Sequence, residues 1–277
     1  MDKGSIGVGF SINKGVTTKI DIQDSQKSEI SIKINGKVSE ASVTRAVIDQ
    51  FSSYLTNKSM KIEHFIDFPI SAGFGASGAG ALSTAFALNK LLGSVFNDIQ
   101  CGQIAHKAEV MNKTGLGDVI GQFHGGFEIR VKEGAPGIGK LKNLNIANDM
   151  KVILGTWGIL ETKKVLMNPT DRNHIINNGE TILNEINERD EADITYLCTK
   201  AREFSRRINL ESPELKQILK MLTKKGNNNC GMVMLGNSFF CFSREDEIPE
   251  ILSIINQLKS KPSILISEIA KNGVKLL

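Results

Sequence analysis

The length, composition and charge of the chain exclude several classes of protein. Its 277 residues are 40% hydrophobic and 23% charged, as in a globular protein of one large or two ordinary domains. The net charge of +4 is too small to predict a nucleic-acid partner, for which a clustered basic stripe is expected, although it suits an anionic small substrate.

Apolar runs and cysteine usage favour a cytoplasmic protein. The longest apolar runs are far shorter than a membrane span, and the first residues lack the basic and then apolar pattern of a signal peptide. The four cysteines show neither a C-x-x-C pair nor a metal-like spacing with histidine; they are Cys101, Cys198, Cys230 and Cys241. We therefore expect free thiols in a reducing cytoplasm and no membrane partner.

The first half of the chain predicts strands followed by helices, from alternating and helical spacing of apolar residues. Strands are expected at 8–12, 16–22, 29–38, 60–68 and 125–131, with a turn at Asn35-Gly36. Helices are expected at 40–55, 77–92 and 98–113. A glycine-rich polar stretch at 132–140 then predicts a loose domain boundary.

The second half predicts a further α/β arrangement. Strands are expected at 150–158, 230–236, 238–243 and 262–269, and helices at 171–187, 192–208, 212–224 and 248–258. The chain is therefore expected to be α+β, with domains at 1–147 and 148–277 and a cleft between them.

The sequence PISAGFGASGAG, residues 69–80, predicts a backbone site for an anion. Glycine at Gly73, Gly75 and Gly78 permits positive φ angles and close approach of a ligand. The helix expected to begin near Ser77 offers free amides and a favourable dipole to a phosphate. Ser77 can cap this helix or face a metal ion. The stretch is neither a Walker A loop nor a dinucleotide fingerprint, and a close-packed small-residue helix remains the alternative.

Two carboxylates follow this stretch, as phosphoryl transfer requires a metal and usually a base. Glu109 lies on the next predicted helix, three residues after His106 and on the same face. Asp118 follows in a G-L-G-D turn, whose glycines can return its carboxylate toward Glu109. Taken singly, Glu109 also fits a solvated helix face and Asp118 a helix cap.

The glycine stretch resembles the phosphate loop of the GHMP kinases, P-x-x-x-G-L-G-S-S-A. The matching residues are Pro69, Gly73, Phe74, Gly75, Ala76, Ser77, Gly78 and Ala79. The resemblance implies ATP and Mg²⁺ as cofactors, an N-terminal domain like that of ribosomal protein S5, and a ferredoxin-like C-terminal domain. It also implies that Ser77 and Glu109 hold the metal and that Asp118 is the catalytic base.

Segments 3–20, 105–130 and 230–243 resemble the archaeal pantoate kinases. This resemblance implies phosphorylation of the primary hydroxyl of (R)-pantoate, giving 4-phosphopantoate for coenzyme A synthesis, in a possible homodimer. It implies that Ser5, His106 and Arg130 bind pantoate, the arginine through the substrate carboxylate. The family pattern places a P-G-H-I-T-G-F-F strand before Ser5, so we expect either a chain start upstream of Met1 or a protein without this strand.

Two alternatives remain open from the sequence. Another GHMP kinase, acting on mevalonate, phosphomevalonate or homoserine, has the same loop, and a phosphorylated substrate would require further basic side chains such as Lys113 and Arg172. A nucleotide-binding relative that has lost activity is the second alternative.

Overall fold

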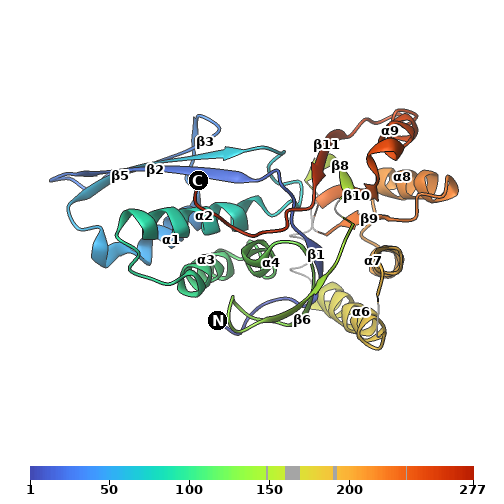
Figure 1. The fold of residues 1–277 in the computed structure, drawn as a ribbon, viewed down its shortest axis with the longest axis horizontal. Helices are drawn as coiled ribbons and strands as arrows, with labels where there is room; N and C mark the ends of the chain where they lie inside the picture. The colour runs from blue at the N-terminus through green and yellow to red at the C-terminus, as the bar shows by residue number, and fades with distance from the viewer. Residues whose placement is uncertain (148, 160–168, 190–191, 235) are drawn as a thin grey trace. The chain divides into compact units, whose positions relative to one another are not determined.

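The computed structural model describes every residue of the chain except 148, 160–168, 190–191 and 235 (Figure 1). Its contacts divide the described residues into two compact units. Unit 1 comprises Met1–Phe68, Gly75–Leu144 and Ala270–Leu277, and unit 2 comprises Pro69–Phe74 and Asn145–Ile269. The domain boundary predicted at residue 147 lies close to Leu144, where the chain leaves unit 1 and enters unit 2. It differs by placing residues 69–74 in the first domain and the last eight residues in the second.

Unit 1 contains a four-stranded sheet with one face covered by helices. Its strands are β2 (Val16–Asp24), β5 (Lys58–Ile66), β3 (Ile30–Ile34) and β4 (Lys37–Val38), in the order β2-β5-β3-β4. Strand β3 is parallel to β5, and the other pairs are antiparallel. The predicted turn at Asn35-Gly36 joins β3 to β4, with positive φ angles of 47° and 78° that suit a tight hairpin.

Three helices lie on one face of this sheet (Figure 1). They are α1 (Ser42–Asp49), α2 (Ala76–Leu91) and α3 (Asp98–Asn112), with a 3₁₀ turn, η1 (Ser52–Tyr54), after α1. Helix α2 packs against β2, and the other two helices pack against α2. Val47, Phe51, Ile62, Leu88 and Ala105 belong to the core between these layers. Along β2 the side chains alternate between half-buried and exposed, because successive residues of a strand point to opposite faces.

A second, three-stranded sheet of unit 1 carries several of the predicted site residues. Its strands are β1 (Gly7–Phe10), β6 (Phe127–Lys132) and β7 (Lys140–Leu144), all antiparallel, in the order β1-β6-β7. Beside it lies the short helix α4 (Asp118–His124). No local pattern in the sequence predicted α4 or β7, and α4 has only seven residues with glycine before and after it.

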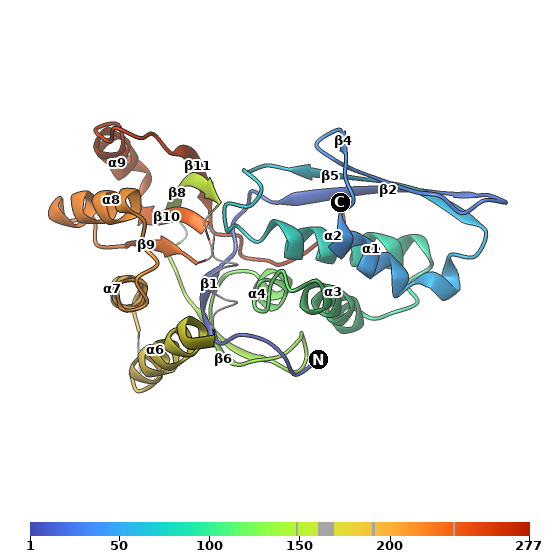
Figure 2. The same ribbon diagram turned by 180° about the vertical axis from the view of Figure 1, so that it is seen from behind.

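Unit 2 is an antiparallel sheet flanked by helices (Figure 2). The strands are β8 (Lys151–Ile159), β9 (Cys230–Val233), β10 (Gly236–Ser243) and β11 (Ser263–Glu268). The helices are α6 (Pro169–Asn187), α7 (Ile194–Arg207), α8 (Pro213–Lys224) and α9 (Ile248–Ile255), with a 3₁₀ turn, η2 (Glu245–Glu247). In chain order the four strands pair as 4-1-3-2, because β11 and β10 flank β8 and β9 pairs with β10. This is the ferredoxin-like arrangement, so the predicted α+β class is confirmed.

The core of unit 2 lies between this sheet and its helices. Ile153, Phe239, Leu215 and Ile251 are among its fully buried side chains. All four cysteines are buried free thiols, as predicted. Within the described part of the chain, no helix has both the length and the apolar character needed to cross a membrane.

Candidate active site

The glycine stretch has an unusual backbone before helix α2. Ser71, Gly73 and Gly75 have φ angles of 67°, 84° and 70°, in the left-handed region that favours glycine. Gly75 is the N-cap residue, and its carbonyl accepts the Ala79 amide at 3.1 Å. The helix therefore begins at Ala76, and the prediction that Ser77 caps it is wrong, since no side chain caps this helix.

The two halves of the predicted loop belong to different units. Pro69, Gly73 and Phe74 lie in unit 2, where a Cβ atom at Gly73 would come within 3.0 Å of Met234 O and Gly236 N. The residues from Gly75 onward lie in unit 1, with the carboxylates. In unit 1 the first amides of α2 have no acceptor within the helix, because a helix leaves its first turn of N–H groups free.

Close packing also explains one of the glycines. A Cβ atom at Gly78 would approach Asp118 Cβ at 3.1 Å and Gln122 Oε1 at 3.1 Å. The absence of a side chain at Gly78 thus lets the first turn of α4 approach the first turn of α2. The small-residue packing considered from the sequence is therefore present, and it brings Asp118 to the start of α2.

Glu109 is buried near the end of α3 and is held from two directions. Its side chain accepts a hydrogen bond from Ser77 Oγ at 3.1 Å on one oxygen and from Thr114 Oγ1 at 2.8 Å on the other. Burial raises the pKa of Glu109, the two hydroxyls lower it, and the nearby charge of Asp118 raises it. The hydroxyls therefore orient a carboxylate that is only 1% exposed.

Asp118 begins helix α4 and points toward Glu109. If Gly115 carried a Cβ atom, this atom would lie 2.6 Å from Glu109 Oε2 and 2.8 Å from Asp118 Oδ2. The two carboxylates thus converge on a space that glycine leaves open, as the G-L-G-D spacing predicted. Asp118 keeps an exposed surface, yet the protein atoms around it partly remove its hydration, which raises its pKa, while Arg130 lowers it.

Arg130 and Ser5 meet beside Gly117. Arg130 Nε donates to the Ser5 carbonyl at 3.3 Å, and Arg130 Nη1 donates to the carboxylate of Glu128. A Cβ atom at Gly117 would clash with Ser5 Oγ and lie 3.0 Å from Arg130 Nε. Ser5, Arg130 and Asp118 are thus neighbours around this glycine.

His106 lies in the core of unit 1 and is 1% exposed. Its Nε2 pairs with the Lys3 carbonyl at 2.7 Å. Burial lowers its pKa, so the ring is neutral at pH 7. One ring nitrogen is therefore already used to hold the N-terminal segment that carries Ser5.

Three further residues, which were not predicted from the sequence, complete this cluster. Thr114 bonds Glu109, and Gln122 Nε2 donates to the Gly75 carbonyl at 2.9 Å. Glu128 pairs with Arg130. Two spacings could have indicated Gln122 and Glu128, because Gln122 follows Asp118 by one helical turn and Glu128 shares a strand face with Arg130.

The chemistry of Ser77 and Glu109 fits a divalent cation bound together with phosphate. A hydroxyl oxygen and a carboxylate oxygen lie 3.1 Å apart at the start of α2. Mg²⁺ commonly takes one or two protein oxygens and fills its remaining positions with water and phosphate. Among the described residues there is no cluster of three acidic, histidine or cysteine side chains that could hold a metal by itself.

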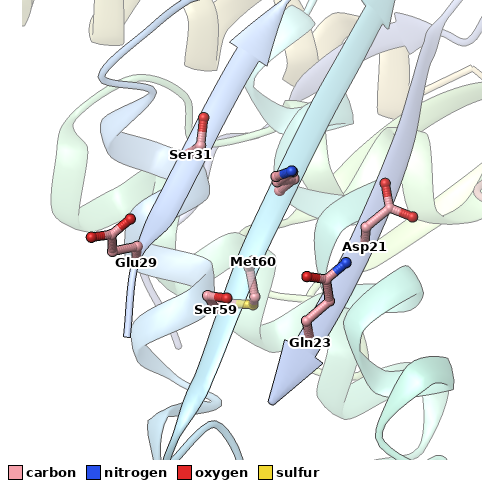
Figure 3. Close-up of a pocket in the computed structure, with 7 residues that line it drawn as sticks. Asp21, Gln23, Glu29, Ser31, Ser59 and Met60 are labelled. Carbon is pink, nitrogen blue, oxygen red and sulfur yellow. The ribbon is translucent and has the colours of Figure 1, made fainter. Parts of the chain in front are cut away.

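A shallow hollow on the outer face of the four-stranded sheet does not form part of this cluster. Figure 3 shows that its lining comes from β2, β3 and β5 and includes Asp21, Gln23, Glu29 and Ser31. These side chains belong mainly to the exposed positions of the strands. Helix α2, whose first turn lies beside Glu109 and Asp118, packs against β2 from the opposite face.

The chain is similar in sequence and in fold to known kinases. Residues 30–126 match the family described as GHMP kinases N terminal domain. The pantoate kinase of Thermococcus kodakarensis is 33% identical over 92% of this chain and 84% of its own length. The pantoate kinase of Methanocaldococcus jannaschii is 31% identical over 91% of this chain and 88% of its own. A solved phosphotransferase related to the coenzyme A biosynthesis pathway is 31% identical, with a TM-score of 0.88 over 98% of this chain and 89% of its own.

Proposed function

Because the chain belongs to the GHMP kinases, and among them to the pantoate kinases, we propose that it transfers the γ-phosphoryl group of ATP to the primary hydroxyl of pantoate. The product is 4-phosphopantoate, a precursor for coenzyme A synthesis. The observation that carries the proposal is the convergence of Glu109 and Asp118 beside Ser77, at the first turn of α2.

The start of α2 suits the phosphates of ATP. Residues Gly75–Gly78 offer peptide N–H groups with the favourable end of a helix dipole, while the Ala79 amide bonds the Gly75 carbonyl. Pro69, Gly73 and Phe74 precede these residues in the segment that matches the GHMP phosphate-loop pattern. Ser77 and Glu109 would hold Mg²⁺, which neutralises the negative charge of the polyphosphate when bound.

Asp118 is the proposed catalytic base. It accepts the proton of the primary hydroxyl while that oxygen forms a bond to the γ-phosphorus and ADP leaves. A raised pKa strengthens a carboxylate as a base, provided it remains ionised at working pH. Arg130 favours the ionised form and thus keeps Asp118 competent.

Arg130, Ser5 and His106 are the proposed contacts of pantoate. The guanidinium of Arg130 pairs with the substrate carboxylate, and Ser5 lies beside it. His106 fixes the N-terminal segment through Lys3, so its effect on pantoate includes the placement of Ser5.

A substrate panel tests the acceptor. We expect the protein with ATP and Mg²⁺ to form 4-phosphopantoate, detected by mass spectrometry, and to leave mevalonate, phosphomevalonate and homoserine unchanged. Phosphorylation of another acceptor in place of pantoate would assign the chain to a different GHMP activity. ATP binding without turnover of any acceptor would favour a relative that has lost activity.

Replacing the base tests the mechanism. Asp118→Asn should lower kcat by about 10²–10⁴-fold, the usual effect of losing a general base, while ATP affinity changes little. Steady-state kinetics together with calorimetric titration of ATP would measure both quantities. A variant with normal turnover would remove Asp118 from this role.

A further inference from the structure

Glu128 is a buried carboxylate that the proposed mechanism does not use. It lies on β6, is 1% exposed, and its Oε2 has no hydrogen-bond partner among the described residues. Gly9 on β1 and Gly121 on α4 leave room for it, since Cβ atoms at either position would crowd its Oε1. A buried carboxylate with an unsatisfied oxygen is costly, so its partner must compensate for much of that cost.

The partner of Glu128 is the same arginine that is proposed to bind the substrate. Arg130 Nη1 donates to Glu128 Oε1, and Arg130 Nε donates to the Ser5 carbonyl. No hydrogen bond engages Nη2 within the described part of the chain. The guanidinium is therefore fixed on two sides, with Nη2 left for a ligand.

The surroundings of Glu128 place its ionisation near neutral pH. The pKa of Glu128 is raised to about 7, because burial raises it by more than the charge and hydrogen bond of Arg130 lower it, and the charge of Asp118 raises it as well. The facing charges are thus Arg130 from its own strand and Asp118 from α4, while β1 presents the uncharged Gly9. With this pKa, the carboxylate is about half protonated at pH 7 and mostly ionised at pH 8.

We propose that Glu128 is a proton-linked counter-ion of Arg130, which holds the guanidinium in the free protein and takes up a proton when the substrate carboxylate binds. This inference rests on the proposed function, in which Arg130 binds a carboxylate. A second carboxylate on Arg130 repels the first, because both then share one positive charge at short range. The proton comes from solvent and ends on Glu128, so proton uptake offsets the negative charge that the substrate carboxylate adds to the buried cluster.

Proton uptake by Glu128 makes the affinity for pantoate fall as pH rises. Binding raises the pKa of Glu128, so pantoate binds more tightly at low pH and more weakly as pH rises through 7 and above. An upward shift of one to one and a half pKa units corresponds to a loss of affinity of roughly five- to tenfold between pH 6.5 and 8.5. Glu128 thereby makes binding of an anionic substrate, but not of a neutral analogue, dependent on protons.

Calorimetric titration in two buffers of different ionisation enthalpy tests this inference with the full chain. At pH 7.5, pantoate binding by the natural protein should take up a substantial fraction of one proton. Glu128→Gln keeps an oxygen for Arg130 Nη1 but cannot titrate, so it should bind pantoate without this uptake and with weaker pH dependence. Glu29→Gln, at an exposed surface ion pair, is the matched control and should behave as the natural protein.

The outcomes separate this inference from the proposed function. Binding and phosphorylation of pantoate without proton uptake would overturn the role of Glu128 alone, as would equal uptake in Glu128→Gln. No binding of pantoate by the natural protein would instead overturn the proposed function. The amide of pantoate, which lacks the carboxylate charge, should bind without the Glu128-dependent uptake.

Discussion

At the scale of single residues, Gly115 and Gly117 leave space in which functional side chains of unit 1 lie close together. A side chain at Gly115 would fill the space between Glu109 and Asp118, and one at Gly117 would fill the space beside Ser5 and Arg130. Neither glycine has a positive φ angle in the left-handed region. Glycine is therefore required at both positions because it lacks a Cβ atom. This absence lets Glu109 approach Asp118, and Ser5 approach Arg130.

Gly115→Ala should strongly impair turnover. Its Cβ would lie 2.6 Å and 2.8 Å from the two carboxylate oxygens, so one of them must move. We expect kcat to fall by about 10²-fold, as for an ångström-scale displacement of reacting groups. Gly15→Ala is the control, because nothing lies within 4 Å of a Cβ atom there. Equal kcat for both variants would contradict the proposed convergence of the carboxylates.

His64 affects stability rather than catalysis. It is 3% exposed, with Thr18 Oγ1 at 2.8 Å from Nδ1 and Thr44 Oγ1 at 2.9 Å from Nε2. Burial lowers its pKa to about 4, below the value of 6.5 expected in the unfolded chain. The folded state therefore favours the neutral ring, and protonation at low pH favours unfolding.

Acidification should destabilise unit 1 through His64. Between the two pKa values the unfolded chain binds more protons, so stability falls as pH decreases from 6.5 toward 4. The contribution amounts to about 2 kcal/mol between pH 7 and pH 5. Urea unfolding followed by circular dichroism would measure it. His64→Gln has no titrating ring, and a variant with the same pH dependence as the natural protein would remove His64 as the cause.

Among elements, helix α4 links the proposed base to the phosphate loop. Asp118 lies in its first turn, and Gln122 lies one turn later on the same face. Gln122 Nε2 donates to the carbonyl of Gly75, the residue that caps α2. Seven residues thus place the base and hold the loop, so a shift of α4 would affect both.

Gln122→Leu should weaken ATP binding more than catalysis. The substitution keeps the size of the side chain and removes the hydrogen bond that holds the Gly75 carbonyl. Loss of one neutral hydrogen bond corresponds to a roughly two- to twelvefold rise in KM for ATP. Gln103→Leu is a matched control, because Gln103 makes the same kind of bond to the Pro136 carbonyl at 3.1 Å. An unchanged KM in Gln122→Leu would show that the bond does not position the loop.

At the scale of the whole molecule, the chain returns to unit 1 after completing unit 2. Residues Ala270–Leu277 belong to unit 1 although β11 just before them belongs to unit 2. Ala270 exchanges hydrogen bonds with the Ser11 carbonyl and the Gly126 amide, at 2.8 Å and 2.6 Å. The Val274 amide donates to the Gln122 carbonyl at 3.1 Å, near the end of α4.

Deletion of this tail should destabilise unit 1. A chain ending at Ile269 loses three backbone hydrogen bonds of about 1 kcal/mol each, so we expect a loss of roughly 3 kcal/mol. Hydrogen exchange at the Gly126 amide would report the local opening. A chain ending at Val274 keeps these bonds and lacks only exposed residues, so it should exchange slowly. Equal exchange in both truncations would show that the tail does not secure unit 1.

Much of the fold follows from local patterns. The turn at Asn35-Gly36, helix α3 and helix α8 lie close to their predicted bounds, because apolar periodicity and turn residues act within a few residues. Helix α4 and strand β7 escaped prediction, since short elements depend on packing more than on propensity. The start of α2 was placed one residue late, because its cap is the left-handed backbone of Gly75 and not the side chain of Ser77.

The candidate site could be predicted only in part. Ser77, Glu109 and Asp118 were expected together, and the structure brings them together. The binding of His106 to Lys3 and of Gln122 to Gly75 joins residues far apart in sequence, which no local pattern specifies. The predicted assignment of pantoate to Ser5, His106 and Arg130 stays a prediction.

The sequence by itself determined the α+β class, the family resemblance and the two carboxylates that follow the glycine stretch. These depend on residue identity and short spacings, which are visible along the chain. Only the tertiary structure decided that Glu109 and Asp118 share the space at Gly115, and that a buried Glu128 neutralises Arg130. Such arrangements depend on which atoms come into contact after folding. Burial then removes water from the ionisable groups and shifts their pKa values.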